Sequence, residues 1–337
     1  MTTNPPVKLT KKDFATDQLV RWCPGCGDYA ILAQVQAAMA DLGWARENFA
    51  VVAGIGCSSR FPYYMNTYGF HTIHGRAPAF ATGLKTTRPE LSVWLVTGDG
   101  DGLSIGGNHL LHLWRRNVDL NVMMFNNRIY GLTKGQYSPT SEVGKKTKSS
   151  PFGSLDTPVD PVRLALGAGC SRVARSVDRF TKHLKQTLID GAMHKGTSFT
   201  EIYQNCNIFN DGAYEHLTER TAKTENVLYL EDGQPLIWGS ESRRGLVLDG
   251  LKLKAVDIAN EADEAQCIVH DTSSKMLALL LAELDGTGGF PVPIGLFYCE
   301  ERPTYDGAFR EQINEARQKL GDGDIERLIR SGDTWTV

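Results

Sequence analysis

The distribution of hydrophobic and polar positions predicts strands and helices that alternate along the chain. Short apolar runs with the length of buried strands occupy residues 49–53, 91–96, 120–125, 197–203 and 293–299. Segments with helical periodicity occupy residues 28–42, 104–116, 178–193 and 305–321. Asp28 is placed to cap the first of these helices, and Gly43 follows its end. Strands that alternate with helices indicate the α/β class, with a doubly wound and mostly parallel sheet.

Loops rich in glycine and polar residues follow the first three predicted strands. Gly54–Cys57 follows the first strand, Gly98–Asp101 the second, and Asn126–Leu132 the third. Ligands of open α/β sheets bind beyond the carboxyl ends of the strands, so these loops predict one common site. The stretch 133–160 is rich in Gly, Ser, Thr, Pro and Lys. It is longer than an ordinary connection, which makes it a candidate functional loop.

Composition and charge exclude several classes of protein. The 337 residues are 41% hydrophobic and 22% charged, which is the profile of a globular chain in water. A net charge of −3 gives no electrostatic footprint for nucleic acid. No apolar run approaches the ~20 residues of a membrane span, and the N-terminus lacks the apolar core of a signal peptide. We therefore expect a cytoplasmic protein with neither a membrane nor a nucleic acid as its partner.

Two of the polar loops carry oxygen ligands suited to a metal-bound diphosphate. A diphosphate needs close approach of the backbone, which glycines permit, and the Mg²⁺ that accompanies it needs hard oxygen ligands. Asp99 can supply a carboxylate, Asn127 an amide oxygen, and Ile129 a backbone carbonyl. Gly-Asp-Gly alone is a frequent turn, but Asn-Asn after the next strand favours a metal site. The combination resembles the signature of thiamine-diphosphate enzymes.

The seven cysteines fall into two groups. Cys170, Cys267 and Cys299 lie in or beside apolar strand-like segments, which is typical of small buried side chains. The others lie in loop-like contexts, and these are Cys23, Cys26, Cys57 and Cys206. A cytoplasmic chain argues against disulfides. Four thiolates suit an iron–sulfur cluster or a structural zinc ion, and their spacing alone does not decide between the two.

Several segments together resemble one family, the β subunits of 2-oxoacid:ferredoxin oxidoreductases. The segments are Trp22-Cys23-Pro24-Gly25-Cys26-Gly27, Gly54-Ile55-Gly56-Cys57-Ser58-Ser59-Arg60, His71-Thr72-Ile73-His74-Gly75-Arg76-Ala77, Gly98–Asp101, Asn126–Leu132, Cys206, and later Arg302–Asp306. Their order and rough spacing match from about residue 20 to residue 210. The resemblance implies the thiamine-diphosphate-binding fold, with this chain as the diphosphate-binding domain.

The resemblance also implies roles for individual residues. The [4Fe–4S] cluster would be held by Cys23, Cys26, Cys57 and Cys206. The Mg²⁺ would be held by Asp99, Asn127 and Ile129. The thiamine diphosphate would be lined by Ile55, Gly56, Cys57, Ser58, His74, Gly75, Arg76, Ala77, Gly100, Asp101, Gly131 and Leu132. Arg60, His74 and Lys134 would act in binding and catalysis, with His74 donating to the diphosphate.

The implied reaction is oxidative decarboxylation of a 2-oxoacid with coenzyme A, with electrons leaving through the cluster to ferredoxin. A redox-inert zinc ion would have no use beside this cofactor. The run from Ser58 to Tyr64 looks more like 2-oxoglutarate enzymes than pyruvate enzymes, because Arg60 would supply a cation for a distal carboxylate. The alternatives are a pyruvate- or indolepyruvate-type member, a non-oxidative thiamine-diphosphate decarboxylase or carboligase, and a non-catalytic metal-binding module.

The resemblance further implies that this chain works only with a partner. The glutamate that activates the cofactor's aminopyrimidine is not identifiable here and would belong to an α subunit, which would also carry much of the coenzyme A site. We expect an (αβ)₂ assembly and an external ferredoxin. The expected organisation is an N-terminal arm over 1–20, a cofactor- and cluster-binding domain over 21–215, and a C-terminal extension over 216–337 packed on that domain and on the partner.

Overall fold

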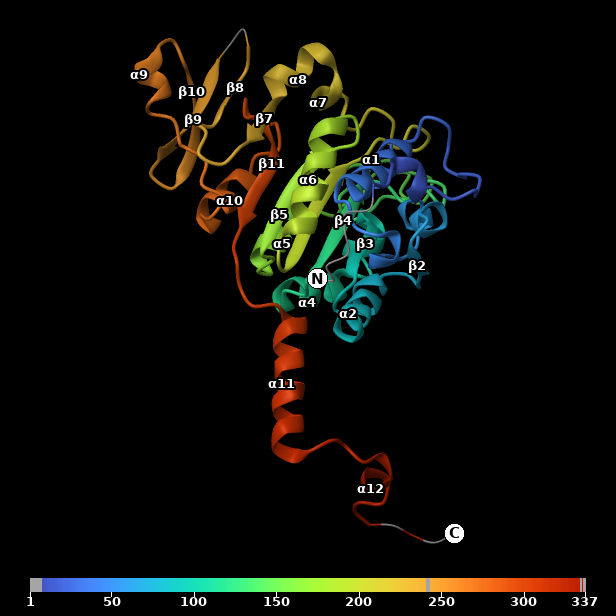
Figure 1. Ribbon diagram of the computed structural model, residues 1–337. Coiled ribbons are helices and arrows are strands. Elements are labelled where there is room, and N and C mark those ends of the chain that lie inside the picture. The colour runs from blue at the N-terminus through green and yellow to red at the C-terminus, as the bar shows by residue number, and fades with distance from the viewer. Residues whose placement is uncertain (1–7, 241–242, 334, 336–337) are drawn as a thin grey trace.

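An eight-stranded sheet forms the centre of the protein in the computed structural model, which describes residues 8–240, 243–333 and 335 (Figure 1). In sheet order the strands are β2 (Tyr68–His71), β1 (Phe49–Ala53), β3 (Ser92–Gly98), β4 (Leu120–Asn126), β6 (Thr197–Tyr203), β5 (Arg172–Val177), β11 (Val292–Cys299) and β7 (Val227–Leu230). Neighbours from β2 to β5 pair in parallel, whereas β11 runs antiparallel to β5 and parallel to β7. The predicted α/β class with a mostly parallel sheet is confirmed.

Both faces of the central strands are buried, which explains the continuous apolar runs in their sequences. On β3, Val93 and Leu95 belong to one hydrophobic core, whereas Trp94 and Val96 belong to the other. One face is covered by α1 (Asp28–Asp41) and α6 (Thr181–Met193). The other face is covered by α2 (Ala77–Thr87), α4 (Gly107–Arg116), α5 (Pro161–Gly167) and α10 (Lys275–Ala282).

The helix starts differ from the sequence expectation at three places. Asp28 does not cap α1: Gly27 holds the cap position, and Asp28 is buried in the first turn. Helix α6 begins at Thr181 rather than at Asp178, whose carboxylate instead accepts a hydrogen bond from the backbone of Asn205 at 2.9 Å. The helix expected over 104–116 begins at Gly107, after the separate short helix α3 (Asp99–Leu103).

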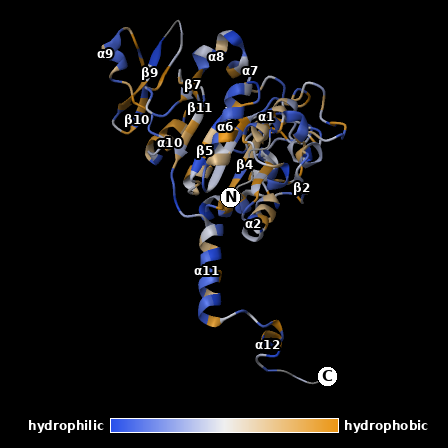
Figure 2. Ribbon diagram, viewed as in Figure 1, coloured by the Kyte–Doolittle hydropathy of each residue, from blue (hydrophilic) through white to orange (hydrophobic). Residues whose placement is uncertain are grey.

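The C-terminal third adds to the main sheet and also extends beyond it. Strands β7 and β11 join the large sheet, while β8 (Ile237–Trp238), β9 (Arg244–Asp249) and β10 (Lys252–Asp257) form a small antiparallel sheet. Helix α11 (Tyr305–Leu320) projects away from the body and is mostly hydrophilic (Figures 1 and 2). The remaining short elements are η1 (Lys11–Phe14), η2 (Arg46–Asn48), η3 (Ser58–Tyr64), α7 (Glu215–Thr218), α8 (Arg220–Asn226), α9 (Glu261–Glu264) and α12 (Ile325–Ile329).

The expected N-terminal arm is described only in part, because residues 1–7 lie outside the described residues. Within the remainder, Phe14 is fully buried and its ring lies 5.6 Å from that of Phe49 in an edge contact. Among the described helices, none is long and apolar enough to cross a membrane.

Candidate functional site

The carboxyl ends of β1, β3, β4 and β6 meet at one edge of the sheet, and a cavity opens there. The predicted site residues that line it are Ile55, Gly56, Cys57, Ser58, His74, Asp99, Gly100, Asp101, Asn127, Ile129, Gly131 and Leu132. Three residues expected at the cofactor do not line it, and these are Gly75, Arg76 and Ala77. The cavity lining also includes Asp28, Tyr130 and Gln204, which sequence reasoning missed.

Asp101 ties the glycine loops of the site together. One carboxylate oxygen accepts hydrogen bonds from the backbone of Ile55 at 3.2 Å and of Gly75 at 2.8 Å. The same oxygen lies 2.6 Å from Nδ1 of His74. A side chain at Gly54 would place its Cβ 1.9 Å from the other oxygen of Asp101, so this approach requires glycine. Asp101 therefore accepts from Nδ1 and orients the imidazole, and Nε2 is a second donor when the ring is an imidazolium.

Asp99 is buried at the start of α3 and is held by two hydroxyls from the 133–160 loop. Ser138 and Thr140 both donate to Oδ2 of Asp99, at 2.5 and 2.7 Å. Burial raises the pKa of Asp99 to about 6, although these two hydroxyls lower it. A buried carboxylate with no cation among its hydrogen-bond partners is suited to a bound metal ion. Neither hydroxyl was identified from the sequence as part of the site.

The Asp99 carboxylate is also linked to an ion pair in the core. Thr140 lies 2.9 Å from Oδ1 of Asn126, and the Asn126 amide donates to Glu201 at 2.7 Å. Glu201 in turn accepts a hydrogen bond from the Arg175 guanidinium at 2.6 Å, and both of these side chains are buried. This chain of contacts fixes the end of β4 relative to the start of α3.

The loop after β4 supplies the other candidate metal ligands. Oδ1 of Asn127 accepts from the backbone of Ile129 at 3.1 Å, and the Tyr130 hydroxyl donates to the carbonyl of Gly100 at 2.8 Å. A Cβ on Gly100 would lie 2.2 Å from the Tyr130 ring. The cavity thus brings together the carboxylate of Asp99, the amide of Asn127 and the backbone of Ile129. These oxygen donors fit Mg²⁺ chemistry.

Two of the four candidate cluster cysteines flank the same loop. A Cβ built on Gly131 would lie 3.5 Å from Sγ of Cys206 and 3.6 Å from Sγ of Cys57. Burial raises the pKa of Cys57 to about 12, and nearby Asp28, Cys206 and Cys23 raise it further. Burial also raises the pKa of Cys26, where Asp28, Cys206 and Cys57 act in the same direction. Cys57 therefore lies within electrostatic reach of the other three thiols.

A single metal ion and a [4Fe–4S] cluster require different arrangements of their cysteine ligands. Among the described residues, no three His, Cys, Asp or Glu side chains converge closely enough to hold one metal ion. In a [4Fe–4S] cluster each thiolate binds a different iron, so the four sulfurs need not converge on one point. Buried thiols with raised pKa values become thiolates when metal cations replace their protons.

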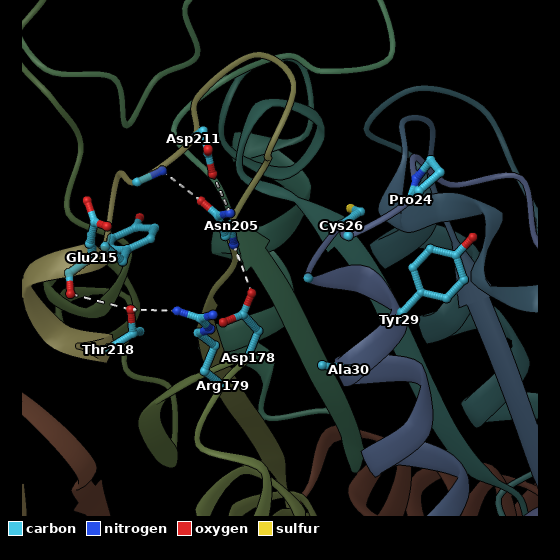
Figure 3. A pocket seen from close by; sticks show the side chains of 14 residues that line it. Pro24, Cys26, Tyr29, Ala30, Asp178, Arg179, Asn205, Asp211, Glu215 and Thr218 are labelled. Atoms are coloured by element: carbon cyan, nitrogen blue, oxygen red, sulfur yellow. Dashed lines mark hydrogen bonds between the residues drawn. The ribbon is translucent and has the colours of Figure 1, made fainter. Parts of the chain in front are cut away.

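The loops that carry Cys26 and Cys206 are joined to each other beside a second, open groove (Figure 3). The backbone of Gly27 donates to the carbonyl of Asn205 at 3.1 Å. The Asn205 side chain donates to Asp211 at 2.8 Å, and its backbone binds Asp178 (Figure 3). These bonds hold the two cysteine loops in a fixed relation.

Asp28 lies close both to the cofactor cavity and to the candidate cluster cysteines Cys26 and Cys57. It is 1% exposed and lines the cofactor cavity. Neither of its carboxyl oxygens has a hydrogen-bond partner of ordinary geometry. Burial raises the pKa of Asp28 to about 7, the Cys26 thiol beside it lowers the pKa, and Asp178 raises it.

The candidate cationic side chains lie outside the cavity lining. Arg60 donates from Nε to the Tyr64 hydroxyl at 3.0 Å and lies over the Tyr63 ring at 5.7 Å. It is close enough to Cys57 to lower the pKa of that thiol. Lys134 is exposed, with a left-handed backbone at φ 73°, and Arg76 donates to the carbonyl of Ile105 at 3.3 Å.

Comparison with known proteins gives a consistent set of relatives. Residues 54–202 match the family model of the C-terminal TPP-binding domain of thiamine pyrophosphate enzymes. The 2-oxoglutarate oxidoreductase subunit KorB of Mycobacterium tuberculosis is 49% identical over 340 residues, which cover 100% of this chain and 90% of that protein. Subunit beta of 2-oxoacid:ferredoxin oxidoreductase 1 from Aeropyrum pernix is 46% identical over 198 residues, 59% of this chain and 62% of that protein.

A solved structure resembles almost the whole chain. The 2-oxoglutarate:ferredoxin oxidoreductase of Magnetococcus marinus, with 2-oxoglutarate, coenzyme A and succinyl-CoA bound, matches with a TM-score of 0.76 and 32% identity. The match covers 97% of this chain and 97% of that chain. The expectation of a thiamine-diphosphate-binding fold is confirmed by this likeness and by the matched family model.

Proposed function

The chain belongs to the β subunits of the 2-oxoacid:ferredoxin oxidoreductases, and from this premise we propose that it carries one [4Fe–4S] cluster and Mg²⁺-bound thiamine diphosphate for the oxidation of 2-oxoglutarate. The products would be succinyl-CoA and CO₂, with the electrons passed to a ferredoxin. The same groups would serve the reverse, carboxylating direction.

One observation carries this proposal: a single loop joins the two sets of candidate ligands. Asn127 and Ile129, at one end of the loop, lie with Asp99 around the cofactor cavity. Gly131, at the other end, lies beside the sulfurs of Cys57 and Cys206. An oxidative route needs an electron acceptor beside the cofactor, and a cluster bound by these cysteines would supply one. A non-oxidative decarboxylase or carboligase would have no use for the four cysteines.

The residues of this chain would divide the work as follows. Asp99, Asn127 and the carbonyl of Ile129 would hold Mg²⁺, and His74, as an imidazolium paired with Asp101, would donate from Nε2 to the diphosphate. Thiamine diphosphate, when bound, supplies the nucleophilic carbon and the electron sink for decarboxylation. The cluster would be bound by Cys23, Cys26, Cys57 and Cys206.

The backbone of Ile55–Ser58 would close one wall of the cavity and exclude water from it. Asp101 would hold this wall in place through its bond to the backbone of Ile55. The other predicted cofactor contacts, at Gly75, Arg76, Ala77, Gly100, Asp101, Gly131, Leu132 and Lys134, remain proposals.

Arg60 is our candidate for recognition of the distal carboxylate of 2-oxoglutarate. Its side chain lies beside Cys57, and its Nε bond to Tyr64 fixes the guanidinium plane. A guanidinium offers two parallel hydrogen bonds to a carboxylate, which an ammonium does not. We expect Arg60→Lys to lower kcat/KM for 2-oxoglutarate relative to pyruvate. Unchanged selectivity would remove Arg60 from substrate recognition.

The chain would function only with its α subunit. Among the described residues, no glutamate lines the cavity that could activate the aminopyrimidine. We propose that the α subunit supplies this group and much of the coenzyme A site, in an (αβ)₂ assembly in the cytoplasm. The external ferredoxin would dock near the cluster.

The test is an anaerobic assay of the assembled heteromer with 2-oxoglutarate, coenzyme A and a ferredoxin. We expect stoichiometric formation of succinyl-CoA and reduced ferredoxin, and neither product from this chain alone. Cys57→Ser should abolish ferredoxin reduction and leave thiamine diphosphate bound. Release of CO₂ with no reduced carrier would favour the non-oxidative alternative.

A further inference from the structure

Gln204 makes contacts with both sets of candidate ligands. It follows β6 directly, is 1% exposed, and lines the cofactor cavity. Its Oε1 accepts a hydrogen bond from the Asn127 amide at 2.8 Å. Its Nε2 lies 3.3 Å from Sγ of Cys26 and also donates to the carbonyl of Asn205. One buried side chain therefore bridges a candidate Mg²⁺ ligand and a candidate cluster ligand.

The orientation of the Gln204 amide is fixed by a backbone group. The backbone N–H of Ile129 donates to Oδ1 of Asn127, so the other end of that amide must be its NH₂. The Asn127 NH₂ can only donate, and it therefore faces the oxygen of Gln204. This leaves the Gln204 NH₂ facing the sulfur of Cys26 and the carbonyl of Asn205, both of which accept.

We propose that Gln204 is a positioning residue that tunes the cluster through its N–H···S contact with Cys26 and orients Asn127 for Mg²⁺. The inference rests on the proposed function, because it needs the cluster and the metal. A hydrogen bond to a cluster sulfur stabilises the more negative, reduced state and so makes the cluster easier to reduce. The acceptor on Asn127 fixes the direction of that side chain in the way that outer partners fix metal ligands.

Two substitutions separate the two contacts. Gln204→Met keeps the length of the side chain and removes all three hydrogen bonds, to Asn127, Cys26 and the carbonyl of Asn205. Gln204→Glu keeps an oxygen for Asn127 and replaces the NH₂ beside Cys26 by a second oxygen. The matched control is Gln36→Met, because Gln36 is also buried and its amide makes one hydrogen bond, to the carbonyl of Tyr64 at 3.2 Å, away from the cavity.

The experiment measures the cluster's midpoint potential by redox titration followed by electron paramagnetic resonance, on the anaerobic heteromer. A second titration measures the Mg²⁺ dependence of thiamine-diphosphate binding. We expect both Gln204 variants to shift the potential to more negative values. Mg²⁺ affinity should fall about 10–100-fold in Gln204→Met and less in Gln204→Glu. Gln36→Met should match the wild type in both measurements.

The outcomes distinguish this inference from the proposed function. A wild-type heteromer without iron and sulfide would overturn both. A wild-type heteromer with a cluster, together with Gln204 variants whose potentials equal that of Gln36→Met, would overturn the role of Gln204 alone. If Gln204→Met assembles no cluster, the potential of Gln204→Glu decides whether the contact with Cys26 tunes the cluster. That variant retains the contact with Asn127.

Discussion

Substitution of Gly100 by alanine tests how closely the cofactor loops pack. The new Cβ would lie 2.2 Å from one carbon of the Tyr130 ring and 2.6 Å from two others. Ordinary contact begins near 3.4 Å, so the ring must move by about an ångström. The Tyr130 hydroxyl would then lose its 2.8 Å hydrogen bond to the Gly100 carbonyl. Tyr130 lies between Ile129 and Gly131, so its displacement moves the loop that carries Asn127.

The energetic cost follows from two effects. Overpacking of a well-packed region costs ~1–3 kcal/mol, and loss of one neutral hydrogen bond costs ~0.5–1.5 kcal/mol. Alanine in place of a helical glycine returns at most ~1 kcal/mol. We therefore expect Gly100→Ala to destabilise the folded chain by about 2 kcal/mol. A loop displacement that costs the cofactor ~1.4 kcal/mol of binding free energy weakens its binding tenfold.

The assay compares Gly100→Ala with Gly107→Ala in thermal unfolding and in calorimetric titration with thiamine diphosphate and Mg²⁺. Gly107 is also helical, and a Cβ there would meet nothing within 4 Å. We expect Gly107→Ala to be neutral and Gly100→Ala to show a lower midpoint and at least tenfold weaker binding. Equal behaviour of the two variants would refute the packing argument.

Two further variants test neighbouring parts of the account. Thr140→Val should weaken Mg²⁺ binding ~10–100-fold in a titration, because it removes a hydrogen-bond donor to Asp99. Thr140→Ser keeps the hydroxyl and should bind Mg²⁺ nearly as the wild type does. Equal loss of affinity in both variants would contradict the role of the hydroxyl. His194→Gln tests the pH dependence of the free energy of unfolding. Burial and then Arg172 lower the pKa of His194 from 6.5 to about 4. Its contribution to stability is complete above pH 6.5 and lost as the pH falls towards 4, by roughly 2 kcal/mol after solvent screening of this half-buried ring. Unfolding midpoints between pH 4.5 and 7 should therefore fall less steeply in the variant, and parallel curves would refute this.

Strands that are buried on both faces were predictable because burial requires continuous apolar sequence. β1 and β4 illustrate this, since their apolar runs match the observed strands almost residue for residue. β5 was missed because Arg172 and Arg175 make it read as polar. Arg175 is nevertheless buried, since Glu201 neutralises its charge and the rings of Tyr203 and Phe297 lie against its guanidinium. Partners that come from other strands leave no local signal.

The candidate site likewise contains residues that leave a local signal in the sequence and residues that leave none. Loops after strands identified Asp99 and Asn127, because the parallel sheet brings such loops to one edge. Thr140 was missed because only the folded 133–160 loop carries its hydroxyl back to Asp99. Gln204 was missed because a glutamine beside a cysteine has no distinctive pattern. Asp28 was assigned the wrong role, since its type and position are typical of a helix cap.

The measurement that tests the central claim most directly is iron, zinc and acid-labile sulfide analysis of the anaerobic heteromer, combined with electron paramagnetic resonance. The account predicts about four irons and four sulfides per copy of this chain, from the stoichiometry of a [4Fe–4S] cluster. It also predicts a reduced-cluster signal that appears when 2-oxoglutarate and coenzyme A are added. One zinc and no iron would contradict the account, and would leave only a thiamine-diphosphate-binding fold without an electron path.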